Sequence, residues 1–168
     1  MTRKLCSALT LVAGLFLALG LGVAGYAQDE KKADPALDRA REQVKMLDDL
    51  YKNAVISVNK NYDGAPAIKM AKDVFKAMEK NGWHSARLVD ATGEPLNEAN
   101  RPMTAFEKAA EKAIRSGQTY YEEVEGKGSD RKLLAATVVP AVHVKCAKCH
   151  GTEVGKLLGF IRYELPVK

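Results

Sequence analysis

Two cysteines and a histidine lie within five consecutive positions of the chain, in the run Cys146-Ala147-Lys148-Cys149-His150. Thiols three positions apart reach the two vinyl groups of one porphyrin, and a histidine directly after the second thiol lies beneath the ring. There the imidazole binds iron as the proximal ligand. The run therefore predicts one covalently attached haem c on Cys146 and Cys149, with His150 on the iron.

Two other interpretations of the run have to be weighed. An exported chain with two cysteines can form a disulfide, but a disulfide does not use the adjacent histidine. The cysteines can also supply half of a zinc site, which needs two further ligands. The other histidines are His84 and His143, and the remaining cysteine is Cys6. Haem attachment uses all three side chains of the run and is preferred.

Residues 1–27 have the pattern of a secretory signal peptide, which includes Cys6. A basic pair, Arg3 and Lys4, precedes an apolar stretch, and Gly25-Tyr26-Ala27 offers small residues before a cleavage site. An uncleaved anchor is the alternative, since about 20 apolar residues span a bilayer. The polar segment that follows favours cleavage.

We therefore expect residues 28–168 to form one haem-binding domain in the periplasm. This location agrees with the motif, because c-type haem is attached outside the cytoplasm. The chain has 26 Lys and Arg against 21 Asp and Glu, and this near balance, without a basic stripe interleaved with aromatics, does not indicate nucleic-acid binding. No second apolar run approaches membrane-spanning length, so no membrane partner is expected after cleavage.

Apolar residues at three- and four-residue steps predict helices over about 35–60, 66–80 and 105–115. Asp34 is placed to cap the first helix. Thr104, with a glutamate three positions later, forms a capping box for the third.

Strands are predicted over about 85–90, 118–125, 131–139 and 157–165, and the glycine-containing turn at 126–130 joins the middle two as a hairpin. Segregated helices and antiparallel-type strands indicate an α+β domain.

Several further stretches, spread over residues 47–167, accompany the haem motif. They are Ala86-Arg87-Leu88-Val89, the loop Glu94-Pro95-Leu96-Asn97-Glu98-Ala99-Asn100-Arg101-Pro102, Glu107, Leu134-Ala135-Ala136 to Pro140, Gly151 after the motif, and Leu157-Leu158-Gly159. With them the chain resembles the single-haem c-type cytochrome family with a PAS-like fold, whose members are small secreted proteins and periplasmic sensing regions of bacterial receptors. The resemblance implies a central antiparallel sheet flanked by helices, with N-terminal helices before the sheet and haem held against it.

The sixth iron position is open to several candidates. Some family members use a cysteine from the helix near position 70, but this chain has Ala67-Ile68-Lys69-Met70-Ala71 there. Met70 is the first candidate because a thioether is an established haem ligand, although a methionine can equally fill the core. His84, His143, Met103 and an empty position are the alternatives.

Three classes of function follow from a single haem. The preferred one is a periplasmic electron-transfer cytochrome whose redox partner and oligomeric state are unknown, with Lys145, Lys148 and Lys156 available to steer an acidic partner. The second is a sensor of redox state or of a small gas that signals through a separate partner. The third, an enzyme such as a peroxidase, needs an acid–base group at an open site. His84 or Glu107 could serve as that acid–base group, but nothing in their spacing singles them out. No enzymatic role is therefore expected.

Overall fold

The structure, a computed structural model, describes residues 33–64 and 67–168. The elements follow one another along the chain. They are α1 (Pro35–Asn61), α2 (Ala67–Lys80), β1 (Ser85–Asp90), the 3₁₀ turn η1 (Glu98–Asn100), α3 (Ala105–Arg115), β2 (Tyr120–Glu125), the 3₁₀ turn η2 (Gly128–Asp130), β3 (Lys132–Pro140), α4 (Val144–His150) and β4 (Leu157–Pro166). The predicted signal peptide, residues 1–27, lies outside the described residues.

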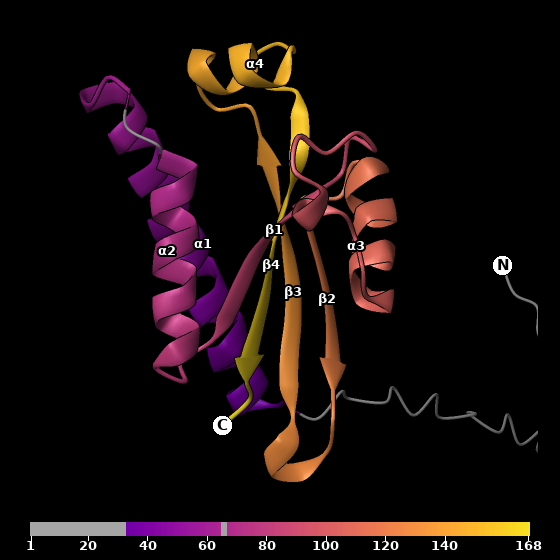
Figure 1. Cartoon of the computed structure of the whole chain (residues 1–168). Helices are drawn as coiled ribbons and strands as arrows, with labels where there is room; N and C mark the ends of the chain where they lie inside the picture. The colour runs from indigo at the N-terminus through magenta and orange to yellow at the C-terminus, as the bar shows by residue number, and fades with distance from the viewer. Residues whose placement is uncertain (1–32, 65–66) are drawn as a thin grey trace, which may run out of the picture. The chain divides into compact units, whose positions relative to one another are not determined.

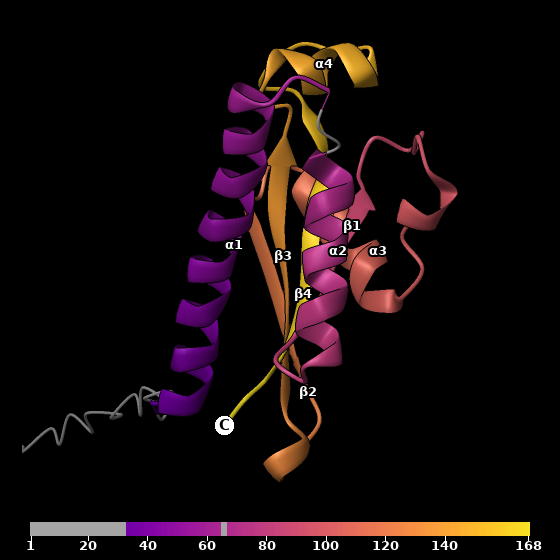
Figure 2. The ribbon, with the colours of Figure 1, turned by 60° about the vertical axis from the view of Figure 1, so that its left-hand side comes forward.

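The four strands form one antiparallel sheet in the order β1-β4-β3-β2. Helices α1 and α2 cover one face of this sheet and α3 covers the other, while α4 lies at the end where β3 stops and β4 starts (Figures 1 and 2). The α+β prediction, with N-terminal helices preceding an antiparallel sheet, is confirmed. The start of α1 and the C-terminus of the chain lie at the opposite end of the sheet from α4 (Figure 1).

The central strand β3 separates two hydrophobic cores because its side chains alternate between the faces. Leu133 and Ala135 face α1 and α2, and they pack with Tyr163 of β4. Leu134 and Ala136 face α3 and belong to a second core. Burial on both faces explains why β3 has a nearly continuous apolar sequence.

The helix starts confirm the capping predictions. Asp34 accepts a hydrogen bond from the backbone N–H of Leu37 at 3.1 Å and begins α1. Thr104 and Glu107 form the reciprocal capping box of α3. The predicted strands are present with shifts of one or two residues at their ends.

The haem motif itself lies in a helix that no periodicity had indicated. Helix α4 has only seven residues, too few for an apolar stripe to be read from the sequence. No helix within residues 33–64 and 67–168 has the length and hydropathy that a membrane span requires.

Candidate functional site

Helix α4 carries all three side chains of the motif. His143 caps its start, with Nδ1 accepting a hydrogen bond from the N–H of Lys145 at 3.2 Å. Gly151 ends it in the left-handed conformation, at φ 60°, which glycine adopts without cost. Cys146 and His150 are therefore held on a short helix with fixed ends.

Helix α4 is also joined to the C-terminal end of α1 and the residues that follow it. Lys145 Nζ donates to the carbonyl oxygen of Asn59 at 2.9 Å and to Oδ1 of Asp63 at 3.0 Å. The two contacts join residues more than 80 positions apart in the chain. They fix the orientation of the motif relative to α1.

Both thiols of the motif are free. Cys146 is partly buried, and Cys149 and His150 are exposed. In the described part of the chain, no group of three or more His, Cys, Asp or Glu side chains is arranged to hold a metal ion. A zinc site on these cysteines would thus need ligands that the fold does not bring near them.

His150 lines a hollow between the sheet, α2 and the loop after β1. A second, adjoining hollow extends toward α1 and shares the side chains of Ile68, Leu88 and Val139 with the first. We call the two together the apolar groove. Its lining consists of Tyr51, Lys52, Val55, Ile68, Ala71, Phe75, Leu88, Val89, Asp90, Pro95, Leu96, Asn100, Val139, Pro140, Val142, His150, Leu158, Gly159, Phe160 and Ile161.

The lining of the apolar groove is chemically suited to contact the hydrophobic face of a porphyrin. Hydrocarbon side chains dominate its lining, and an imidazole stands at one end beside two free thiols on the same helix. Several of its large apolar side chains are exposed, among them Ile68 at 47% and Leu96 at 68%. Exposed apolar clusters of this kind mark ligand sites. The sequence analysis identifies residues 94–102 as a loop and does not predict this wall; the apolar pair Pro95-Leu96 is the signal that could have indicated it.

His84, a candidate sixth ligand, lies in the core away from His150. It is buried, and its Nε2 makes a hydrogen bond of 2.9 Å with the hydroxyl of Tyr51. Burial lowers the pKa of its imidazole. Since β1 rises by about 3.3 Å per residue, His84 lies roughly 20 Å along the strand from Asp90, which lines the groove with His150.

The other candidates lie outside the groove lining. Met70 is on α2 but 48% exposed, whereas its neighbours Ile68 and Ala71 line the groove. His143 uses one ring nitrogen as the cap of α4. Met103 is exposed, and its backbone N–H donates to Glu107. Met70 as the sixth ligand stays a prediction.

The three lysines near the motif differ in their contacts. Lys145 is committed to the contacts with α1, and Lys156 lies 4.0 Å from the carboxylate of Glu153. Lys148 is exposed and has no ion-pair partner among the described residues. Of these three lysines, Lys148 is therefore the one whose charge is not paired within the described residues.

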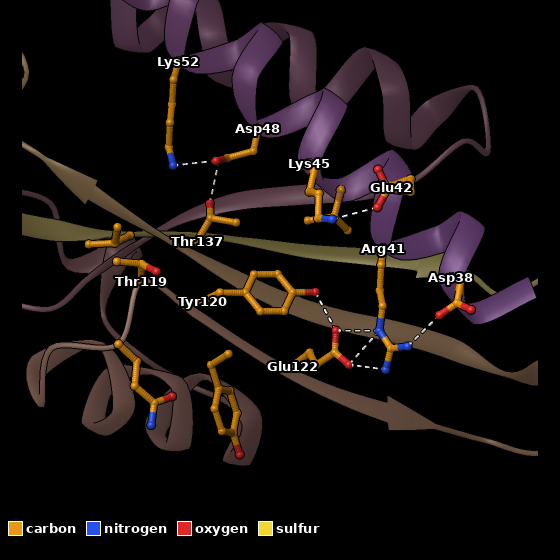
Figure 3. Close-up of a pocket in the computed structure, with 14 residues that line it drawn as sticks. Asp38, Arg41, Glu42, Lys45, Asp48, Lys52, Thr119, Tyr120, Glu122 and Thr137 are labelled. Carbon is orange, nitrogen blue, oxygen red and sulfur yellow. Dashed lines mark hydrogen bonds and ion pairs between the residues drawn. The ribbon is translucent and has the colours of Figure 1, made fainter. Parts of the chain in front are cut away.

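A larger hollow lies between α1 and strands β2 and β3, away from the motif. We call it the α1–β2 cavity, and Figure 3 shows its charged side chains directed at one another. Arg41 donates to Glu122 at 2.9 Å, Lys45 pairs with Glu42, and Lys52 pairs with Asp48. Its charged side chains all pair within the cavity, and none of the predicted site residues lines it.

Comparison with known proteins identifies the family and the fold. No protein of curated function matches the chain. The fold is similar to a solved structure described as the crystal structure of the cyanobacterial heme-protein Tll0287, with a TM-score of 0.51 and 14% identity over 80% of this chain and 96% of that one. The sequence profile of the Tll0287-like family matches residues 28–160. The resemblance seen in the sequence is thereby confirmed, and the chain belongs to the Tll0287-like family.

Proposed function

We propose that this protein binds one haem c covalently through Cys146 and Cys149, with His150 as proximal iron ligand, and that it acts as a periplasmic electron-transfer cytochrome. The observation that carries the proposal is the position of His150, which lines an apolar groove while two free thiols lie on the same seven-residue helix. The description of the similar structure as a heme-protein supports haem binding.

When bound, the haem supplies a one-electron couple, and the protein supplies its surroundings. His150 orients the iron, and the thioethers keep the group in a domain of limited size. The hydrocarbon wall formed by Ile68, Leu88 and Val139 would lower the polarity around a bound haem, which would favour the less charged ferrous state and raise the reduction potential. Lys148 is placed to steer an acidic redox partner toward the exposed end of α4.

The experiment that tests haem attachment is expression of the full chain in a strain competent in cytochrome maturation. We expect a mature protein that begins near Gln28, whose mass is increased by one haem and whose reduced spectrum is that of a thioether-linked haem. Rapid oxidation and reduction without turnover of peroxide support an electron carrier. A colourless protein of unmodified mass contradicts the proposal.

A sensor is the second candidate, and one observation favours it. Among the residues that line the apolar groove, His150 is the sole histidine and methionine is absent. An iron without a second protein ligand binds small gases. Fast binding of carbon monoxide to the ferrous protein, combined with a high-spin spectrum, favours a sensor; a low-spin, unreactive iron favours the electron carrier.

A further inference from the structure

The loop from Pro95 to Arg101 forms one side of the apolar groove. Pro95, Leu96 and Asn100 line the same part of it as His150. The bonds inside the loop are local: Asn97 Oδ1 accepts from the N–H of Ala99, and Arg101 pairs with Glu98. These bonds set the shape of the loop, while its position against the sheet depends on other elements.

Arg87, on β1, ties the loop to the sheet. Its Nη2 donates to the carbonyl oxygens of Ala99 at 3.2 Å and Arg101 at 2.9 Å. Its Nη1 lies 3.4 Å from Oε1 of Glu107 on α3. One planar guanidinium thus contacts the loop at two points and a second element at a third.

Glu107 completes the attachment from the other side. Its carboxylate is only 1% exposed, and Oε2 accepts from the N–H groups of Met103 at 2.8 Å and Thr104 at 3.2 Å. Oε1 has no hydrogen bond among the described residues and faces Arg87. A buried carboxylate is costly unless a cation balances it, so the C-terminal half of the loop and the start of α3 converge on this single ion pair.

We propose that Arg87 is a positioning residue that holds the 95–101 loop closed against the haem groove, with Glu107 as its buried counter-charge. The proposal rests on the proposed haem function. With the loop held there, Pro95 and Leu96 form one side of the groove beside His150, and this apolar cover would limit water at a bound haem and raise its reduction potential. The closed loop also restricts the entry of external ligands.

The test compares holoprotein variants. Arg87→Lys keeps a positive charge beside Glu107 but loses the planar fork that reaches two carbonyls and a carboxylate together. Arg115→Lys is the matched control, because it makes the same substitution on α3, where Arg115 pairs with Glu111 and has no hydrogen bond or ion pair with the loop among the described residues. A double variant, R87Q/E107Q, removes the buried charge together with its partner and serves if Arg87→Lys does not fold.

We expect Arg87→Lys to carry the same amount of haem as the wild type, with a lower reduction potential, several-fold faster imidazole binding to the ferric protein, and faster amide exchange over residues 96–103. Arg115→Lys should match the wild type in all three. Unchanged values in Arg87→Lys, or equal shifts in Arg115→Lys, overturn the positioning role. Absence of covalent haem in the wild type overturns the proposed function instead, while amide exchange still reports whether Arg87 holds the loop.

Discussion

The apolar groove and the α1–β2 cavity both border α1 yet differ in chemistry. The groove is lined mainly by hydrocarbon, with His150 at one end, whereas charged side chains line the cavity and pair among themselves (Figure 3). In the larger hollow the charged side chains already have partners. Free thiols and exposed apolar side chains, which have none among the described residues, therefore locate the candidate site better than the volume of a hollow does.

The two hollows are connected through the core beneath α1. Tyr51 lines the groove, and its ring stacks on Tyr163 with centroids 6.4 Å apart. Tyr163 and Thr137 both donate to Asp48, which lines the cavity. A substitution in one hollow thus reports on that hollow alone only if it leaves these core contacts intact.

The largest expected effect is on haem attachment. Replacing Cys146 and Cys149 together with serine should abolish covalent haem, because no thiol remains to form a thioether. Mass spectrometry of the exported protein measures the loss. Arg41→Met, in the α1–β2 cavity, is the control and should retain full haem. An equal loss of haem in Arg41→Met and in the double serine variant would mean that the loss is not specific to the thiols of α4.

Met70→Leu tests the predicted sixth ligand. If Met70 holds the iron, the methionine–iron charge-transfer band disappears and the reduction potential falls, since a thioether stabilises ferrous haem. Met103→Leu is the matched control. A band that persists in Met70→Leu eliminates Met70.

Ile68→Asp places a carboxylate in the groove wall. The negative charge stabilises ferric iron by on the order of 1 kcal/mol, for a separation of about 10 Å at an effective dielectric constant of 20, so the reduction potential should fall. Val74→Asp is the control on the same helix, since both side chains are 47% exposed and Val74 does not line the groove. Equal shifts would contradict the groove as the haem site.

The α1–β2 cavity should respond in stability alone. Arg41→Met removes a partly exposed pair with Glu122, and pairs of this kind contribute about 1 kcal/mol or less. Urea unfolding measures the change, and the reduction potential should match that of the wild type. A changed potential would mean that the cavity takes part in haem chemistry.

The smallest effect concerns His84 and is confined to acid pH. Burial lowers the pKa of its imidazole below the ordinary 6.5, so the unfolded chain takes up a proton at a higher pH than the folded chain does. The free energy of unfolding should therefore decrease as the pH falls below about 6.5. The difference in urea midpoint between neutral and mildly acid pH measures this, and His84→Gln should reduce it; an undiminished difference would assign the slope to other groups.

The motif and the caps could be predicted from the sequence because each depends on neighbours a few positions away. Cys146, Cys149 and His150 are specified by spacing, and Asp34 and Thr104 by the backbone N–H groups that follow them. Strand alternation and turn glycines similarly determined the α+β class.

The groove, in contrast, was decided by tertiary structure alone. Ile68, Leu96 and His150 belong to three segments that meet only because β1 and β3 both pair with β4. The same packing buries His84 against Tyr51 and leaves Met70 half exposed. Local spacing encodes what a residue can bind, but long-range strand pairing determines what it faces.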